Sequence, residues 1–90
     1  MKETVSISDA CKETGFSERQ LRSFEARGYI EAPIKVRCGS IQYRRYTPEH
    51  IQEIKIFKKY LDQGFKLRFA SIKAFEEQAE EVKNNVKITE

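Results

Sequence analysis

Two short stretches near the start of the chain, SISDACKETG (6–15) and FSERQLRSFEARG (16–28), carry matching start and stop signals. In each, a serine stands three residues before an Asp or a Gln, which is the spacing of a capping box at a helix N-terminus. Each stretch closes on a glycine, a residue that commonly ends helices. These signals predict helices over 7–14 and 18–27, joined by the tight glycine-containing turn of a helix-turn-helix.

The residues that follow change to a β pattern and then return to a helical one. IKVR and IQYRRY, rich in β-branched and aromatic residues, flank CGS, which predicts a β-hairpin over 34–46. A Thr-Pro-Glu start predicts a helix over 48–63, and apolar residues at three- and four-residue steps predict another over 67–84. Residues 85–90 are expected to fray. The sequence therefore predicts one domain over 1–84, mainly α with a small β-hairpin: a winged helix-turn-helix with four helices.

The second predicted helix is apolar on one narrow side and basic on the other. At 100° per residue, Leu21 and Phe24 fall together on the side expected to face the core. The opposite side carries three arginines and two small residues, which are Arg19, Arg22, Arg27, Ser23 and Ala26. No acidic residue is expected among these arginines, and like charges on one helix face repel one another. An anionic partner is therefore expected opposite this face.

The positive charge of the chain lies before Ala74, and the remainder is acidic. Up to Lys73, 15 basic side chains stand against 9 acidic ones, whereas from Ala74 onward 2 stand against 5. The basic residues between 19 and 45, where only Glu25 and Glu31 are acidic, are Arg19, Arg22, Arg27, Lys35, Arg37, Arg44 and Arg45. Such a concentration is typical of a nucleic-acid binder. The alternative is an ordinary solvated face.

The last two predicted helices are expected to pack on each other. The core side of the third helix is formed by Ile51, Ile54, Phe57 and Leu61, and another side carries Ile56 and Tyr60. The fourth helix has apolar residues at Leu67, Phe69, Ile72, Phe75, Ala79 and Val82. We expect this stripe to cover the second side of the third helix. Tyr46, at the end of the hairpin, is expected to point into the core.

Catalytic and metal-binding chemistry have little support in the sequence. His50 is expected to be a solvated surface residue, because no Ser, Cys or pair of acids is spaced around it for catalysis. Cys11 and Cys38 lack the spacing of a zinc site or a disulfide framework. No signal peptide or membrane span is recognisable. We therefore expect a cytoplasmic protein that is not an enzyme and that needs no metal or cofactor.

The order of elements resembles the DNA-binding domain of the MerR family of bacterial transcription regulators, over about residues 4–75. The motifs that carry the resemblance are, in order, SISDACKETGFSERQLRSFEARGYIEAP, YRRYTPEHIQEI and LDQGFKLRFASIK. They match the helix-turn-helix, the end of the wing with the third helix, and the fourth helix of the family. Three motifs in this order are more specific than any one alone.

The resemblance implies that the helix over 18–27 enters the major groove and that the hairpin is a wing on the DNA backbone. Tyr43 and Arg44 match a tyrosine and an arginine that grip the sugar-phosphate backbone in the family. The expected DNA-contacting residues are Ser17, Arg19, Gln20, Arg22, Ser23, Arg27, Lys35, Arg37, Tyr43, Arg44 and Arg45. Ser23 and Phe24 stand where members commonly have two adjacent aromatic residues, so the base preference stays open.

The resemblance leaves the partners of the chain open. The chain ends before the long dimerisation helix and effector domain of full-length regulators, and no cysteine follows Cys38 to form a metal sensor. Double-stranded DNA is the expected partner, in the nucleoid, with a second copy or RNA polymerase as further possibilities. An excisionase-like architectural protein and a protein-interaction module that docks an acidic partner are the alternative functions. The DNA target and the direction of regulation stay open.

Overall fold

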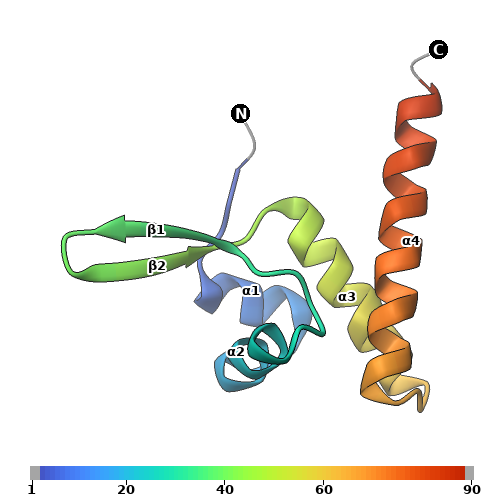
Figure 1. Cartoon of the computed structure of the whole chain (residues 1–90), viewed down its shortest axis with the longest axis horizontal. Helices are drawn as coiled ribbons and strands as arrows, with labels where there is room; N and C mark the ends of the chain where they lie inside the picture. Colours follow the sequence, from blue (N-terminus) through green and yellow to red (C-terminus); the bar gives the residue numbers. More distant parts are fainter. Residues whose placement is uncertain (1–2, 89–90) are drawn as a thin grey trace.

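The computed structural model describes the backbone of residues 3–88 and the side chains of residues 3–79 (Figure 1). The elements are α1 (Ile7–Thr14), α2 (Glu18–Arg27), β1 (Ile34–Cys38), β2 (Ile41–Arg45), α3 (Pro48–Asp62) and α4 (Leu67–Ile88). The two strands form one antiparallel hairpin, which extends away from α1 and α2. The described residues thus form the predicted winged helix-turn-helix.

The ends of α1 and α2 lie where the capping signals predict them. At the start of α2, the Ser17 side chain accepts a hydrogen bond from the backbone N–H of Gln20, and the Gln20 side chain accepts one from Ser17. Gly28, with φ of 80°, ends the helix in the left-handed region that favours glycine. Local capping chemistry therefore fixes the position of this helix along the chain.

His50 differs from its prediction as a solvated residue, because its side chain is only 8% exposed. Its Nδ1 accepts a hydrogen bond from the backbone N–H of Thr47, and its own backbone N–H donates to Thr47 Oγ1. His50 therefore occupies the third position of a capping box that opens α3 and packs edge-on against the ring of Tyr46. The prediction of an exposed histidine was wrong.

Aromatic side chains from the turn between α1 and α2, from α2 and from α3 form the centre of the core. Phe16, in the turn between α1 and α2, lies 5.0 Å from the ring of Phe24, which lies 5.1 Å from the ring of Phe57 on α3. Leu21 is fully buried, and Tyr46 is 1% exposed, as predicted. Burial of each such side chain stabilises the fold by roughly 1.5–3 kcal/mol. This core fixes the orientation of α2.

Helix α3 packs against α1 on one side and α4 on the other, as its two apolar sides predict. Leu67 of the predicted α4 stripe packs against the core, but otherwise the α4 face turned to α3 is not the predicted one. Its buried residues are Ala70, Ser71 and Ala74, whereas the exposed fractions of Phe69, Ile72 and Phe75 are 59%, 46% and 44%. Small side chains let two helices approach closely, and the Ser71 hydroxyl donates to the Tyr29 carbonyl at 2.6 Å.

The ends of the last two helices also differ slightly from prediction. Helix α3 ends at Asp62, one residue early, and α4 continues to Ile88 and projects past α3 (Figure 1). Ala79 is exposed, and Val82 of the predicted stripe lies outside the residues whose side chains are described. Within the described part of the chain, no helix is both long enough and apolar enough to cross a membrane.

Candidate DNA interface

Helix α2 turns its apolar residues inward and its arginines outward. Leu21 and Phe24 are 0% and 9% exposed, because they pack into the aromatic core. The residues of the opposite arc, of which all but the partly buried Ser23 are exposed, are Arg19, Arg22, Ser23, Ala26 and Arg27. The small Ser23 and Ala26 keep the middle of this arc low between the longer arginine side chains. A broad surface could therefore approach the helix backbone closely.

Arg22 is not free of acids, in contrast to the prediction for this arc. Its Nη2 lies 2.7 Å from the Glu18 carboxylate, one turn earlier on the same helix, and both side chains are about half exposed. The hydrogen bond to Glu18 raises the pKa of Arg22. An exposed pair of this kind contributes little to stability and opens readily. Arg22 is therefore paired with Glu18 in the free protein but remains available to a partner at the surface.

The wing has two chemically different faces. Alternation along the strands and the register Val36↔Tyr43 and Lys35↔Arg44 define them. One face carries Lys35, Arg37, Gln42 and Arg44. The other carries Ile34, Val36, Ile41, Tyr43 and Arg45, of which the first four are 46–54% exposed. The basic face is the one that reaches α2, through the contacts of Lys35 and Arg44 described next.

Glu25 of α2 connects this basic face to the helix. Its Oε2 lies 2.8 Å from Lys35 Nζ, and its Oε1 lies 2.8 Å from Arg44 Nη2 and 2.9 Å from Arg44 Nε. The Glu25 side chain is only 8% exposed. Burial alone would raise its pKa, but the hydrogen bonds and charges of Lys35 and Arg44 outweigh burial and lower the pKa. Glu25 is thus ionised and paired with one cation from each strand.

Arg45 faces away from this cluster. Its Nε donates to Thr4 Oγ1 at 3.0 Å and its Nη2 donates to the Thr4 carbonyl at 2.9 Å. Beside it, Val5 and Tyr46 form an isolated antiparallel bridge. These contacts hold the N-terminal segment against the base of the wing. Of the predicted DNA-contacting residues, Tyr43 and Arg45 therefore lie on the opposite wing face from Lys35, Arg37 and Arg44.

Ser17 and Gln20 lie at the N-terminus of α2, where both are exposed and joined by the capping box. A helix N-terminus carries a partial positive charge and attracts anions. Of the predicted wing residues, Lys35 and Arg44 reach α2, at Glu25. The two acids of α2, Glu18 and Glu25, were not predicted as partners of the basic residues.

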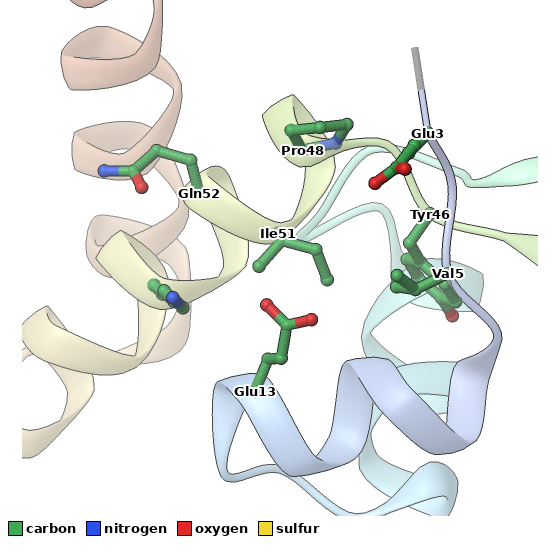
Figure 2. A pocket seen from close by; sticks show the side chains of 8 residues that line it. Glu3, Val5, Glu13, Tyr46, Pro48, Ile51 and Gln52 are labelled. Atoms are coloured by element: carbon green, nitrogen blue, oxygen red, sulfur yellow. The ribbon is translucent and has the colours of Figure 1, made fainter.

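A cavity of about 310 Å³ lies between the N-terminal segment, α1 and α3. Figure 2 shows the Glu13 carboxylate pointing toward Ile51 in this cavity, with Glu3 and Pro48 on its far side. Tyr46 also contributes to its lining, but none of the predicted DNA-contacting residues does. This cavity is therefore separate from the basic face formed by α2 and the wing.

Comparison of the chain with known proteins identifies its family. The family described as MerR HTH family regulatory protein matches residues 5–78. The chain is similar to the HTH-type transcriptional regulators CueR of Salmonella typhi, Escherichia coli O157:H7 and Yersinia pestis. Each is 32% identical over 63 residues, which make up 70% of this chain and 43–44% of the relative. The chain thus spans less than half the length of these relatives.

Proposed function

The chain belongs to the MerR family of helix-turn-helix regulatory proteins, and on that premise we propose that it is a transcription regulator that binds double-stranded DNA by sequence. In this proposal α2 lies in the major groove and the wing lies on the adjacent sugar-phosphate backbone. Base edges in the major groove carry the sequence information, and phosphates fix the position of the protein.

The observation that carries the proposal is the contact between α2 and the basic wing face at Glu25. Lys35 and Arg44 reach Glu25 on α2, so these two wing cations lie beside the helix that carries the exposed arginines. A duplex presents phosphates on both sides of the major groove, which suits a helix flanked by a basic ribbon.

The proposed roles follow from position. Arg22, on the exposed arc of α2, reads a base edge, because a guanidinium can bind guanine through two hydrogen bonds. Phosphate contacts come from Ser17, Arg19, Gln20, Ser23, Arg27, Lys35, Arg37 and Arg44. Tyr43 lies on the opposite wing face, so it contacts the DNA backbone only at the edge of the interface. Arg45 instead holds the N-terminal segment through Thr4.

We also propose partners other than DNA. Two copies binding a two-fold site, alone or together with RNA polymerase, describe a regulator that acts at promoters. An architectural protein of the excisionase type would use the same surface to shape DNA without contacting polymerase. The number of copies bound per duplex and the bend induced in it distinguish these roles.

Selection from random duplexes, followed by affinity measurement on the selected sequence, tests the proposal. The affinity should fall with salt with a slope of about −0.9 per phosphate contacted. If the exposed Arg19, Arg27 and Arg37 alone engage phosphates, the slope is about −3, and it is steeper if the acid-paired cations also engage. Native mass spectrometry of the complex gives the stoichiometry.

Arg22→Ala should weaken binding to the selected duplex by about 1–3 kcal/mol and relax the preference at one base position. Lys55→Ala is the matched control, since Lys55 lines the cavity and not the proposed interface. Equal loss on every duplex would reassign Arg22 to phosphate contact. If the wild-type protein binds no duplex even at low salt, the DNA-binding function is wrong and a protein module that docks an acidic partner is favoured.

A further inference from the structure

Glu25 presents a conflict between its charge and its place. It lies on the helix proposed to face DNA, where a carboxylate opposes the approach of phosphates. It also neutralises Lys35 and Arg44, two of the cations available to the duplex. Its charge therefore works against DNA affinity, and its contribution has to come from the contacts that it makes.

The hairpin has few other attachments to the helices. Its strands pack mainly on each other, and the apolar wing face, with Ile34, Val36 and Ile41, is about half exposed. Among the described residues, its base is held through Arg45 to Thr4 and through the Val5–Tyr46 bridge, both of which lead to the N-terminal segment. The ion pairs of Glu25 connect the wing directly to α2.

The Glu25 contacts are also suited to fixing a position. The carboxylate uses one oxygen for each strand, and from Arg44 it accepts a hydrogen bond from Nε and forms an ion pair with Nη2. Its side chain is 8% exposed, so water competes poorly for these contacts. The pair between Glu18 and Arg22, by contrast, lies within α2 and is half exposed, so it constrains only one side chain.

We propose that Glu25 is a positioning residue that locks the wing at a fixed distance from α2, and that this lock provides selectivity for the target sequence at the expense of general affinity. With the wing fixed, α2 and the wing meet the duplex as one rigid unit, so the base contacts of α2 form only in one register. With the wing free, its cations bind phosphates in any register. This inference rests on the proposed DNA-binding function and deepens it.

The test compares Glu25→Gln with Glu31→Gln on the selected duplex and on a scrambled duplex. Glu31 is the matched control, because it is exposed in the segment between α2 and β1, so its substitution removes the same charge without releasing the wing. Glu31→Gln should change both affinities by the same factor. Glu25→Gln should leave the scrambled affinity equal or higher and should reduce the ratio of the two affinities roughly tenfold.

A second variant keeps the net charge constant. Glu25→Asp retains the carboxylate but shortens its reach by one methylene, so it should lower the affinity ratio less than Glu25→Gln does. Backbone ¹⁵N relaxation of the unbound proteins should show greater motion of β1 and β2 in Glu25→Gln than in Glu31→Gln. Circular dichroism establishes whether each variant is folded. If Glu25→Gln is unfolded, the comparison is made with Glu25→Asp instead.

The outcomes separate this inference from the function on which it rests. If the wild-type protein binds no duplex, the proposed function fails. Alternatively, the wild-type protein binds selectively while Glu25→Asp, and Glu25→Gln if it is folded, keep the wild-type ratio of selected to scrambled affinity. In that case the lock is refuted and the proposed function stands. The lock would also be refuted if Glu25→Gln lowered the affinity ratio while ¹⁵N relaxation showed its wing to be as rigid as that of Glu31→Gln.

Discussion

Glu53 of α3 should make the stability of the protein depend on pH near neutrality. Glu53 is only 2% exposed, and its Oε2 has no hydrogen-bond partner among the described residues. Burial raises its pKa from 4.5 to about 7, while a hydrogen bond from the Glu31 backbone lowers it in part and the Glu31 charge raises it further. The ionised form is therefore strongly disfavoured in the folded protein.

The sign and size of the effect follow from these two pKa values. In the unfolded chain Glu53 titrates near 4.5 and in the folded protein near 7. Its stabilising contribution is therefore present in full below pH 4.5 and is lost as the pH rises through 7. At about 1.4 kcal/mol per pKa unit, the loss reaches roughly 3 kcal/mol by pH 8. This is a large fraction of the roughly 5–15 kcal/mol that stabilises a typical domain.

Glu53→Gln removes the ionisation and keeps the shape of the side chain. We expect the free energy of unfolding of the wild-type protein, from urea titrations followed by circular dichroism, to decrease between pH 5 and pH 8. The decrease should be nearly absent in Glu53→Gln, which should be the more stable of the two at pH 8. The lowered pKa of Glu25 acts with the opposite sign and below this window, because it removes stability as the pH falls.

Two results would refute this reasoning. A wild-type stability that stays level or rises from pH 5 to pH 8 would mean that Glu53 is ionised in the folded protein at no cost. A decrease that persists unchanged in Glu53→Gln would assign the pH dependence to another group.

Two further predictions test the packing. Tyr46→Phe removes a buried hydroxyl that has no hydrogen-bond partner among the described residues, so the melting temperature should stay the same or rise, and a clear fall would show that the hydroxyl is bonded. Phe69→Ser should change the free energy of unfolding by less than about 0.5 kcal/mol, because Phe69 is 59% exposed, whereas Phe57→Ala in the core should cost about 3–5 kcal/mol. Similar losses in the last two variants would mean that α4 presents its aromatic side to α3.

Features that depend on neighbouring residues could be predicted from the sequence. The ends of α1 and α2 follow from a serine, its partner three residues later and a closing glycine, all of which interact within one or two turns. The hairpin turn at Gly39 and the burial of Tyr46 follow from patterns of similar range. His50 was missed because the capping position after Thr47 is usually filled by Glu or Gln, and here an imidazole nitrogen accepts the same hydrogen bond.

Features that depend on distant residues could not be predicted in this way. The size of the apolar side chains on α4 suggested that Phe69 and Phe75 face α3, but the close approach of two helices favours Ala70 and Ala74 instead. The distance between helix axes depends on the packing of the whole domain, so the spacing of apolar residues along one helix does not reveal it. The partners of Glu25 likewise come from residues 10 and 19 positions later, so no local spacing marks them.

The acids on α2 show why net charge alone describes this surface poorly. Counting charges gives a strongly basic region, yet Glu18 and Glu25 pair with three of its cations. Pairing lowers the attraction for any polyanion, so it weakens binding to all sequences alike, but it also restricts where those cations can lie. A regulator must distinguish one site from a large excess of others, and a restricted geometry serves this need better than additional charge. The arrangement of the α2 and wing cations is therefore more informative about DNA recognition than their number.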